Sequence, residues 1–297
     1  MLIALLLACA STPKSTALEQ SPDPAKAVVE LLEVGAPEGV VASVAVIRGS
    51  EVQLLGEPER LYELGSISKV FNAWLLATLE EEGVLSEQDL LSKHYPVVPK
   101  GNGDQIQLVH LASHSSGLSR LPGNMNLRYL IQNFDAPYVD YDAAMLQQAV
   151  ADEKVRQEPG TSWAYSNFGA ALLGQIMATE LQQPWADAVE ERVLAPHGLT
   201  GIGELEPPAG PGAEGEVATW DFDVMAPAGS LDGDLNAMVA VAQIWLEPDA
   251  VMRSMLAVRM ESEPYSSGLG WIQGDGYWWH NGGTAAYSTF VAVDPAL

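Results

Sequence analysis

Residues 63–71 read Glu63-Leu64-Gly65-Ser66-Ile67-Ser68-Lys69-Val70-Phe71, and this stretch predicts both the fold and a candidate active site. From Ser66 to about Glu82 the residues are apolar almost all round, which is typical of a helix in the middle of a domain, and Gly83 is a suitable stop. Ser66 and Lys69 are three residues apart, so their side chains lie on one face at the helix start. The stretch therefore predicts an amine within reach of a serine hydroxyl.

The expected burial of Lys69 has a chemical consequence. An ammonium in a dry pocket loses solvation, so its pKa falls toward neutrality and the amine can act as a base. The helix N-terminus also favours negative charge on an attacked carbonyl oxygen. The spacing by itself is weak evidence, because Ser11-Thr12-Pro13-Lys14 matches it too, and the alternative is a helix-start serine beside a solvated lysine.

A second polar string, Tyr165-Ser166-Asn167, follows a Pro-Gly turn and precedes an apolar helix expected through Ala170 to Ala178. A phenol beside a lysine ammonium is easier to ionise, so Tyr165 is a candidate to shuttle a proton between Ser66 and a leaving group. Asn167 is a candidate to bind a substrate amide. The alternative is a core tyrosine with a capping asparagine.

A third string, His280-Asn281-Gly282, continues a strand that begins at Tyr277 and precedes Gly283 and a second strand from Ala286 to Val293. Glycines at such a place let a backbone and a ligand approach closely. The N–H of Gly283, paired with that of Ser66, is a candidate oxyanion hole. The alternative is a hairpin turn with a structural histidine.

Taken in order, these strings resemble the motifs of the serine β-lactamase and penicillin-binding-protein superfamily, in the branch of class C β-lactamases, D-alanyl-D-alanine carboxypeptidases and related esterases. The resemblance runs from about residue 27 to the end. Four further segments contribute to it: Leu111-Ala112-Ser113-His114-Ser115-Ser116-Gly117-Leu118, Pro159 to Gly169, Ala226-Pro227-Ala228-Gly229-Ser230 and Gly268-Leu269-Gly270-Trp271.

The resemblance implies a serine hydrolase that forms an acyl-enzyme on an amide, a β-lactam or an ester, without a metal or organic cofactor. It makes Ser66 the nucleophile, gives Lys69 and Tyr165 the proton transfers, and places Asn167 against the substrate. It also implies that the substrate is bound by His280, Gly282 and Gly283. The implied alternatives are a slowly deacylating penicillin-binding protein and a non-catalytic envelope lipoprotein that binds a partner.

The fold implied is α+β in two lobes, a β-lactamase/transpeptidase-like antiparallel sheet flanked by helices and a helical lobe. Residues 27–297 would form this domain, with the sheet lobe at about 27–60 and 268–297 and the helical lobe at about 66–267. Family members continue beyond the position of Leu297 into another strand and a C-terminal helix. That strand lies between the N-terminal hairpin and the strand ending near Val293, so its loss leaves two open sheet edges. Either the sheet pairs again, a partner fills the gap or the chain is incomplete, and each of these puts the activity in doubt.

His280 stands where members of this superfamily commonly carry lysine. Histidine is mostly neutral at pH 7 unless a carboxylate raises its pKa. We therefore expect weaker selection for a substrate carboxylate, and more tolerance of neutral esters and amides, than in a lysine-bearing relative.

The N-terminus suggests export. Residues 1–9 form an apolar run that ends in Leu-Leu-Ala-Cys, resembling a lipoprotein signal in which Cys9 is lipidated, and it is too short to span a membrane. Residues 10–26 are rich in Ser, Thr and Pro, which is typical of a linker. We expect a bacterial cell-envelope location through a lipid anchor, with a secreted protein released by ordinary signal cleavage as the alternative.

The net charge of −25, from 39 acidic and 14 basic residues, excludes a nucleic-acid partner and leaves the lipid as the expected membrane contact. The expected partner is a small-molecule or peptidoglycan-peptide substrate. No histidine spacing suggests a metal site, and His94, His110, His114 and His197 are expected to be structural. The Gly- and Pro-rich stretch Gly201 to Gly215 is expected to be a surface loop bordering the cleft.

Overall fold

The computed structural model describes residues 3–5, 26, 40–125, 129, 136–212, 215–274 and 276–294. The predicted helix from Ala27 to Gly35, Cys9 and nearly all of the predicted linker lie outside these ranges. The α-helices are α3 (Ser68–Glu81), α4 (Leu91–His94), α5 (Leu108–Ala112), α7 (Ala143–Asp152), α8 (Asn167–Leu181), α9 (Trp185–Val189), α10 (Leu235–Leu246) and α11 (Ala250–Met255). Short helical turns of other types are η1 (Gly65–Ile67), η2 (Asn102–Gln105), η3 (Glu190–Leu194), η4 (Ala195–His197) and η5 (Asp223–Ala228).

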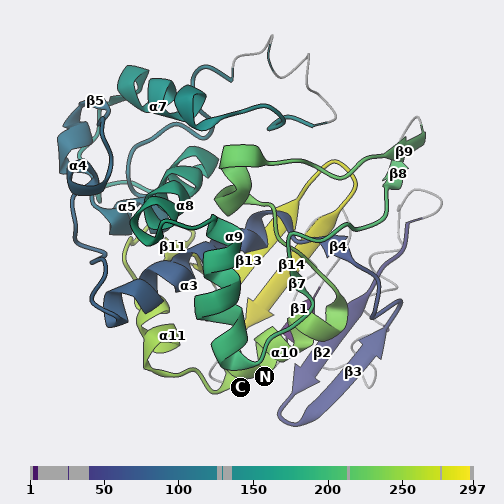
Figure 1. The fold of residues 1–297 in the computed structure, drawn as a ribbon. Coiled ribbons are helices and arrows are strands. Elements are labelled where there is room, and N and C mark those ends of the chain that lie inside the picture. The colour runs from purple at the N-terminus through teal and green to yellow at the C-terminus, as the bar shows by residue number, and fades with distance from the viewer. Residues whose placement is uncertain are drawn as a thin grey trace.

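The strands form several small sheets, which Figure 1 shows beside the helices. The four-stranded sheet has the order β11 (Ser266–Ser267), β12 (Ile272–Gly274), β13 (Tyr277–Gly283) and β14 (Ser288–Val293), and all its pairs are antiparallel. One three-stranded sheet has the order β1 (Ile3–Leu5), β2 (Val44–Arg48) and β3 (Glu51–Leu55). A second has the order β4 (Tyr62–Glu63), β10 (Asp232–Gly233) and β7 (Ile202–Gly203). The two-stranded ones are β5 (Lys100–Gly101) with β6 (Lys154–Val155), and β8 (Gly210–Gly212) with β9 (Gly215–Val217). The predicted α+β class with antiparallel sheets is confirmed.

One of the two edges that we expected to be open, that of β2, is occupied. Strand β1 pairs antiparallel with β2, with Ala4 opposite Val46, and it also contacts β14. Of the three expected outcomes, renewed pairing of the sheet is the one observed at the edge of β2. The extended segment at residues 3–5 satisfies backbone N–H and C=O groups that would otherwise be unpaired on the edge of β2. Helix α10 contacts β2 and β14, so it spans both sheets.

Helix α3 is the centre of the packing, and it contacts α8, α9 and α11 (Figure 1). Its residues from Ser68 to Ala77 are buried on all sides of the helix, as the sequence predicts. Trp74 is fully buried and packs edge-on against Trp245 of α10 at 5.3 Å between ring centroids, and Trp245 packs at 5.0 Å against Trp271 beside β12. This row of indoles joins the helices to the sheet, and truncation of one such buried ring typically costs about 3–5 kcal/mol.

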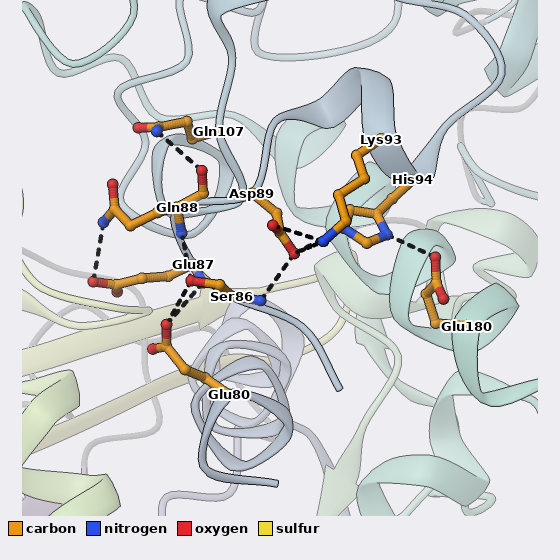
Figure 2. A network of polar contacts seen from close by, with 9 residues as sticks. All are labelled: Glu80, Ser86, Glu87, Gln88, Asp89, Lys93, His94, Gln107 and Glu180. Carbon is orange, nitrogen blue, oxygen red and sulfur yellow. Dashed lines mark hydrogen bonds and ion pairs between the residues drawn. The ribbon is translucent and has the colours of Figure 1, made fainter. Parts of the chain in front are cut away.

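A polar network fixes the connection after α3, and Figure 2 shows its side chains. Asp89 accepts hydrogen bonds from Lys93 at 2.8 Å and from the N–H of Ser86 at 3.1 Å, and its carboxylate lies 2.9 Å from a ring nitrogen of His94. The other ring nitrogen of His94 lies 2.7 Å from Glu180 of α8. The bond from Lys93 leads the groups that hold the pKa of Asp89 at about 2. The network therefore connects this turn to α8.

We expect Asp89→Asn to lower the free energy of unfolding by about 1 kcal/mol at pH 7, because the variant loses charge-assisted hydrogen bonds. The difference should shrink as pH falls below 3.8, since the stabilisation from a depressed pKa is lost as pH drops through about 2. Urea denaturation at pH 7 and pH 3 measures both effects. Asp152→Asn, at a carboxylate that is 65% exposed, is the control and should change little at either pH. An equal loss at both pH values would contradict the assignment.

Candidate active site

Ser66 lies in the turn η1 at the start of α3, where the chain leaves β4. The sequence predicts an α-helix from Ser66, but the α-helix begins at Ser68 because the first turn is a tighter 3₁₀ turn. Gly65 enters this turn with a φ of +54°, a conformation that favours glycine. Ser66 lies in this turn and Lys69 in the first turn of α3, so their side chains, three residues apart, are neighbours on one face. Ser66 is partly exposed to solvent.

Lys69 is buried, and its Nζ lies 3.0 Å from Ser66 Oγ and 2.6 Å from the carbonyl oxygen of Ala228. Burial holds the pKa of Lys69 well below its ordinary value, and the charge of Arg120 lowers it further. The neutral amine can donate one N–H to Ala228 while its lone pair faces the hydroxyl of Ser66. The predicted depression of the Lys69 pKa is confirmed in direction and in cause.

Tyr165 contacts the same lysine, but its ionisation differs from the prediction. Lys69 Nζ lies 5.0 Å from the centroid of the Tyr165 ring. Burial raises the pKa of Tyr165 above its ordinary value of 10.0, and the opposing effects of a hydrogen bond with Ser66 and of Arg120 are smaller. The prediction of an easily ionised phenol was wrong, since a neutral Lys69 offers no charge to favour a phenolate. Tyr165 is thus a proton donor at neutral pH.

Asn167 is the first residue of α8, and Ser166 is the cap, because its hydroxyl accepts the N–H of Gly169 at 2.8 Å. The alternative of a capping asparagine is therefore wrong. Asn167 Nδ2 donates to the hydroxyl of Tyr138 at 3.0 Å. Its Oδ1 is buried and has no partner among the described residues. One half of the amide is thus fixed, and the other is free for a ligand.

His280 lies on β13 and is fully buried. Its Nδ1 is 2.7 Å from the carbonyl oxygen of Asn281, which can only accept, so Nδ1 carries the proton and Nε2 is a bare acceptor. Burial lowers the pKa of His280 to about 3. The ring is neutral, as the sequence predicts, and lies 6.2 Å from that of Tyr165. Within the described chain Nε2 has no hydrogen-bond partner.

The register of β13 directs the N–H of Gly283 toward the serine. Thr284 and Tyr287 form a hydrogen-bonded pair at 2.9 Å, so Gly283 and Ser288 form the next, non-hydrogen-bonded pair and the N–H of Gly283 points away from β14. On that side β12 ends its pairing at Trp279. A Cβ on Gly65 would lie 2.8 Å from the nitrogen of Gly283. The N–H groups of Gly283 and Ser66 therefore belong to neighbouring segments.

Gly282 explains how the strand comes so close. A Cβ there would meet the carbonyl oxygen of Leu64 at 2.0 Å and the hydroxyl of Thr289 at 2.3 Å. That hydroxyl donates to the same carbonyl at 2.8 Å. Only a glycine allows β13 to lie directly against the residue that precedes the serine turn.

Two buried carboxyl groups lie on the strands β4 and β10, next to the serine turn. Glu63 and Asp232 face each other across β4 and β10. Glu63 accepts the N–H of Trp220 and the hydroxyl of Thr284, both at 2.7 Å, and Asp232 accepts the N–H of Leu205 at 2.9 Å. Burial, followed by the neighbouring carboxylates, raises the pKa of Asp232 to about 8. A protonated Asp232 avoids repulsion with Glu63 and fastens the predicted surface loop to the site.

Sequence reasoning missed two neighbours of the catalytic candidates, Arg120 and Tyr138, and it missed the contact of His114 with Tyr165. Arg120 lies over the Tyr165 ring, with its Cζ 4.9 Å from the ring centroid. His114 is indeed structural, because its Nδ1 accepts the N–H of Ser166 at 3.2 Å, yet its ring packs 4.4 Å from Tyr165. Tyr138 stacks on Phe222 at 5.0 Å beside Asn167. The motif at residues 111–118 predicts that this region lies near the site, but it does not predict the contact of Arg120 with the Tyr165 ring.

Two other features of the described chain bear on ligands. A cavity of about 430 Å³, lined by Trp74, Glu82, Arg192 and His197 among others, lies at the C-terminal half of α3 and so away from Ser66. Over the described ranges, His, Cys, Asp and Glu side chains form no group of three or more that could hold a metal. Likewise, no described helix is long and apolar enough to cross a membrane.

A family model described as Beta-lactamase matches residues 34–297. This match and the fold define a protein of the β-lactamase and penicillin-binding-protein class. The chain belongs to the Beta-lactamase family, and the resemblance read from its motifs is confirmed.

Curated relatives match part of the chain. It is 30% identical over 153 residues to a beta-lactamase of Providencia stuartii, covering 52% of this chain and 36% of that protein. It is 31% identical over 145 residues to the D-alanyl-D-alanine-carboxypeptidase/endopeptidase AmpH of Escherichia coli (strain K12), covering 48% and 36%. The chain therefore matches little more than a third of the length of these relatives.

Solved structures match nearly the whole chain in fold. A class C beta-lactamase from Rhodobacter sphaeroides superposes with a TM-score of 0.78 at 19% identity, covering 93% of this chain and 91% of the other. An octameric penicillin-binding protein homologue from Pyrococcus abyssi gives a TM-score of 0.71 at 18% identity, covering 96% and 75%. At such identities the likeness establishes the fold alone.

We expect Gly65→Ala to reduce acylation of Ser66 at least a hundredfold, because its Cβ would displace the N–H of Gly283 from the oxyanion position. Gly83→Ala is the matched control, since Gly83 also has a positive φ, of +72°, but a Cβ there meets nothing within 4 Å. Both variants carry the backbone strain of about 1 kcal/mol. Rates of covalent labelling by a fluorophosphonate, followed by intact mass, compare them. Similar rates in the two variants would refute the oxyanion assignment.

Proposed function

We propose that the protein is a serine hydrolase that forms an acyl-enzyme on Ser66 and acts on an amide, a β-lactam or an ester. The observation that carries this proposal is the contact of 3.0 Å between Ser66 Oγ and a buried lysine whose pKa is strongly lowered. A structural lysine would normally be solvated or paired with a carboxylate. Lys69 has a carbonyl and a hydroxyl for partners instead, which is the arrangement that a general base needs.

In the proposed acylation step, Lys69 takes the proton of Ser66 as Oγ attacks the substrate carbonyl carbon. The N–H groups of Ser66 and Gly283 stabilise the oxyanion that forms. The N–H of Ser66 is available because the first N–H groups of a helix have no partner within it. In this proposal Asn167 binds an amide of the substrate through Oδ1, which has no partner among the described residues, while Nδ2 donates to Tyr138.

Collapse of the tetrahedral intermediate requires a proton for the leaving group. The neutral phenol of Tyr165 supplies it, and Lys69, protonated in the first step, can restore it. Burial of Tyr165 raises its pKa and so favours the protonated phenol over the phenolate. A water molecule then releases the acyl group by the reverse proton transfers, with no metal or organic cofactor.

The names of the relatives support the reaction class. They include a beta-lactamase and a carboxypeptidase, and a D-stereospecific amidohydrolase from Streptomyces shares the fold. A second candidate, a slowly deacylating penicillin-binding protein, draws support from the structural likeness to a penicillin-binding protein homologue. It differs from the hydrolase only in the last step. The third candidate, a non-catalytic lipoprotein that binds a partner, predicts no acylation.

Intact-mass detection of a fluorophosphonate or penicillin adduct on the full chain tests the proposal. We expect an adduct on the wild type and none on Ser66→Ala. Lys69→Met should label at least a hundredfold more slowly at pH 7. The wild-type labelling rate should fall as pH drops through the lowered pKa of Lys69, because protonation removes the base.

Circular dichroism of each variant is the control for folding. A folded wild type that stays unlabelled by both probes would refute the hydrolase. Rapid labelling followed by continued turnover of a chromogenic substrate supports the hydrolase, whereas a lasting adduct with one turnover favours the penicillin-binding protein.

We further propose that the chain is exported to the bacterial envelope and lipidated at Cys9, or else secreted after ordinary signal cleavage. The apolar run before Cys9 supports this proposal. The pairing of β1 with β2 needs residues 3–5 to be retained, so processing and this strand exclude each other. Metabolic labelling with a palmitate analogue, wild type beside Cys9→Ser, is expected to mark the wild type alone. Recovery of an unlabelled protein that keeps Met1 would overturn the proposal.

A further inference from the structure

Gly283 offers an N–H to the oxyanion, but it cannot fix the direction of that N–H by itself. The residue is exposed and has no side chain, and a glycine backbone adopts more conformations than any other. The direction of the N–H must therefore be set by the residues on either side. On one side Gly282 lies against the carbonyl oxygen of Leu64. On the other side is Thr284.

Thr284 is held in place by its hydroxyl. The hydroxyl donates to a carboxylate oxygen of Glu63 at 2.7 Å and accepts the N–H of Tyr287 at 3.3 Å. The N–H of Thr284 donates in turn to the carbonyl oxygen of Tyr287 at 2.9 Å. The hydroxyl thus has one orientation, and it joins the turn after β13 to a side chain of β4.

The carboxylate of Glu63 is suited to hold this hydroxyl firmly. The side chain is buried, and a buried carboxylate is costly unless hydrogen bonds satisfy its oxygens. One oxygen accepts the hydroxyl of Thr284 and the other accepts the N–H of Trp220 at 2.7 Å. Hydrogen bonds to an ionised acceptor are stronger than those between neutral groups.

The strand that carries Glu63 is itself fixed beside the nucleophile. Strand β4 pairs with β10, and the N–H of Leu64 donates to the carbonyl oxygen of Leu231 at 2.8 Å. The serine turn η1 follows directly after Leu64. Both contacts that hold the N–H of Gly283 therefore come from the two residues that precede this turn.

We infer that Glu63 is a positioning residue for acylation, because its bond to the hydroxyl of Thr284 directs the N–H of Gly283 toward the oxyanion. This inference rests on the proposed function, in which that N–H stabilises the negative charge formed when Ser66 attacks. Glu63 takes no proton in this step and acts only through Thr284. The oxyanion is absent from the ground state, so loss of the bond lowers the rate of acylation and leaves substrate binding nearly unchanged.

The test uses an ester and the matched thionoester, in which sulfur replaces the carbonyl oxygen, in single-turnover acylation of the full chain. Sulfur accepts hydrogen bonds weakly, so the oxyanion N–H groups assist the ester far more. We expect Thr284→Val to lose roughly ten- to a hundredfold in rate on the ester and little on the thionoester, at an unchanged half-saturating concentration. Thr284→Ser keeps the hydroxyl and should retain most of the rate.

Glu63→Gln should lower the same ester-to-thionoester ratio, because an amide has one oxygen for the two donors. In the double variant with Thr284→Val it should lower this ratio no further, since both changes break one bond. Thr179→Val is the matched control. Its hydroxyl also donates at 2.7 Å, to the carbonyl oxygen of Gln175 in α8, and its loss should leave both rates unchanged.

An equal loss on both substrates in Thr284→Val would overturn the inference, since it would indicate general damage to the site. A change in the half-saturating concentration alone in Glu63→Gln would overturn it too, because Glu63 would then act through Trp220. Labelling of Ser66 by a fluorophosphonate separates the two proposals. An unlabelled wild type would refute the hydrolase and this inference together, whereas a labelled wild type with the same ratio as Thr284→Val would refute the inference alone.

Discussion

The close approach of the serine turn to strand β13 is the constraint on which the site depends. Gly65 and Gly282 lie at the contact, and a side chain on either would collide with the backbone of the other segment. The contact brings two N–H groups from distant parts of the sequence to one place, and it uses the start of a helix for one of them. Burial of α3 on all sides fixes the position of the turn, so the packing of the indoles also determines where the N–H of Ser66 lies.

Burial, rather than ion pairing, controls protonation throughout the site. It lowers the pKa of Lys69 and His280 and raises that of Tyr165, so that all three favour their neutral forms. A neutral amine, a neutral phenol and a bare imidazole nitrogen can pass protons without first separating charge in a medium of low dielectric constant. A carboxylate beside Lys69 would restore its charge and remove the base.

Local patterns predicted what depends on neighbours in sequence. The Ser66–Lys69 spacing, the apolar helix and the β13–β14 hairpin follow from periodicity and from turn residues, and all are present. The ionisation of Tyr165 was predicted wrongly because it depends on how deeply tertiary packing buries the ring. Arg120 was missed because its role arises from a contact across 45 positions of the chain, for which sequence shows no period. The pairing of β1 was missed because an apolar run suits an exported signal and an edge strand alike.

The neutrality of the buried bases makes Arg120 chemically distinct. When several basic groups crowd one pocket, each lowers the pKa of the others, and the group with the highest intrinsic pKa keeps its proton. In this cluster Arg120 is exposed, whereas Lys69, His114 and His280 are buried. The guanidinium of Arg120 adds to the effect of burial in lowering the pKa of Lys69, and both favour the neutral amine that the proposed proton transfer requires.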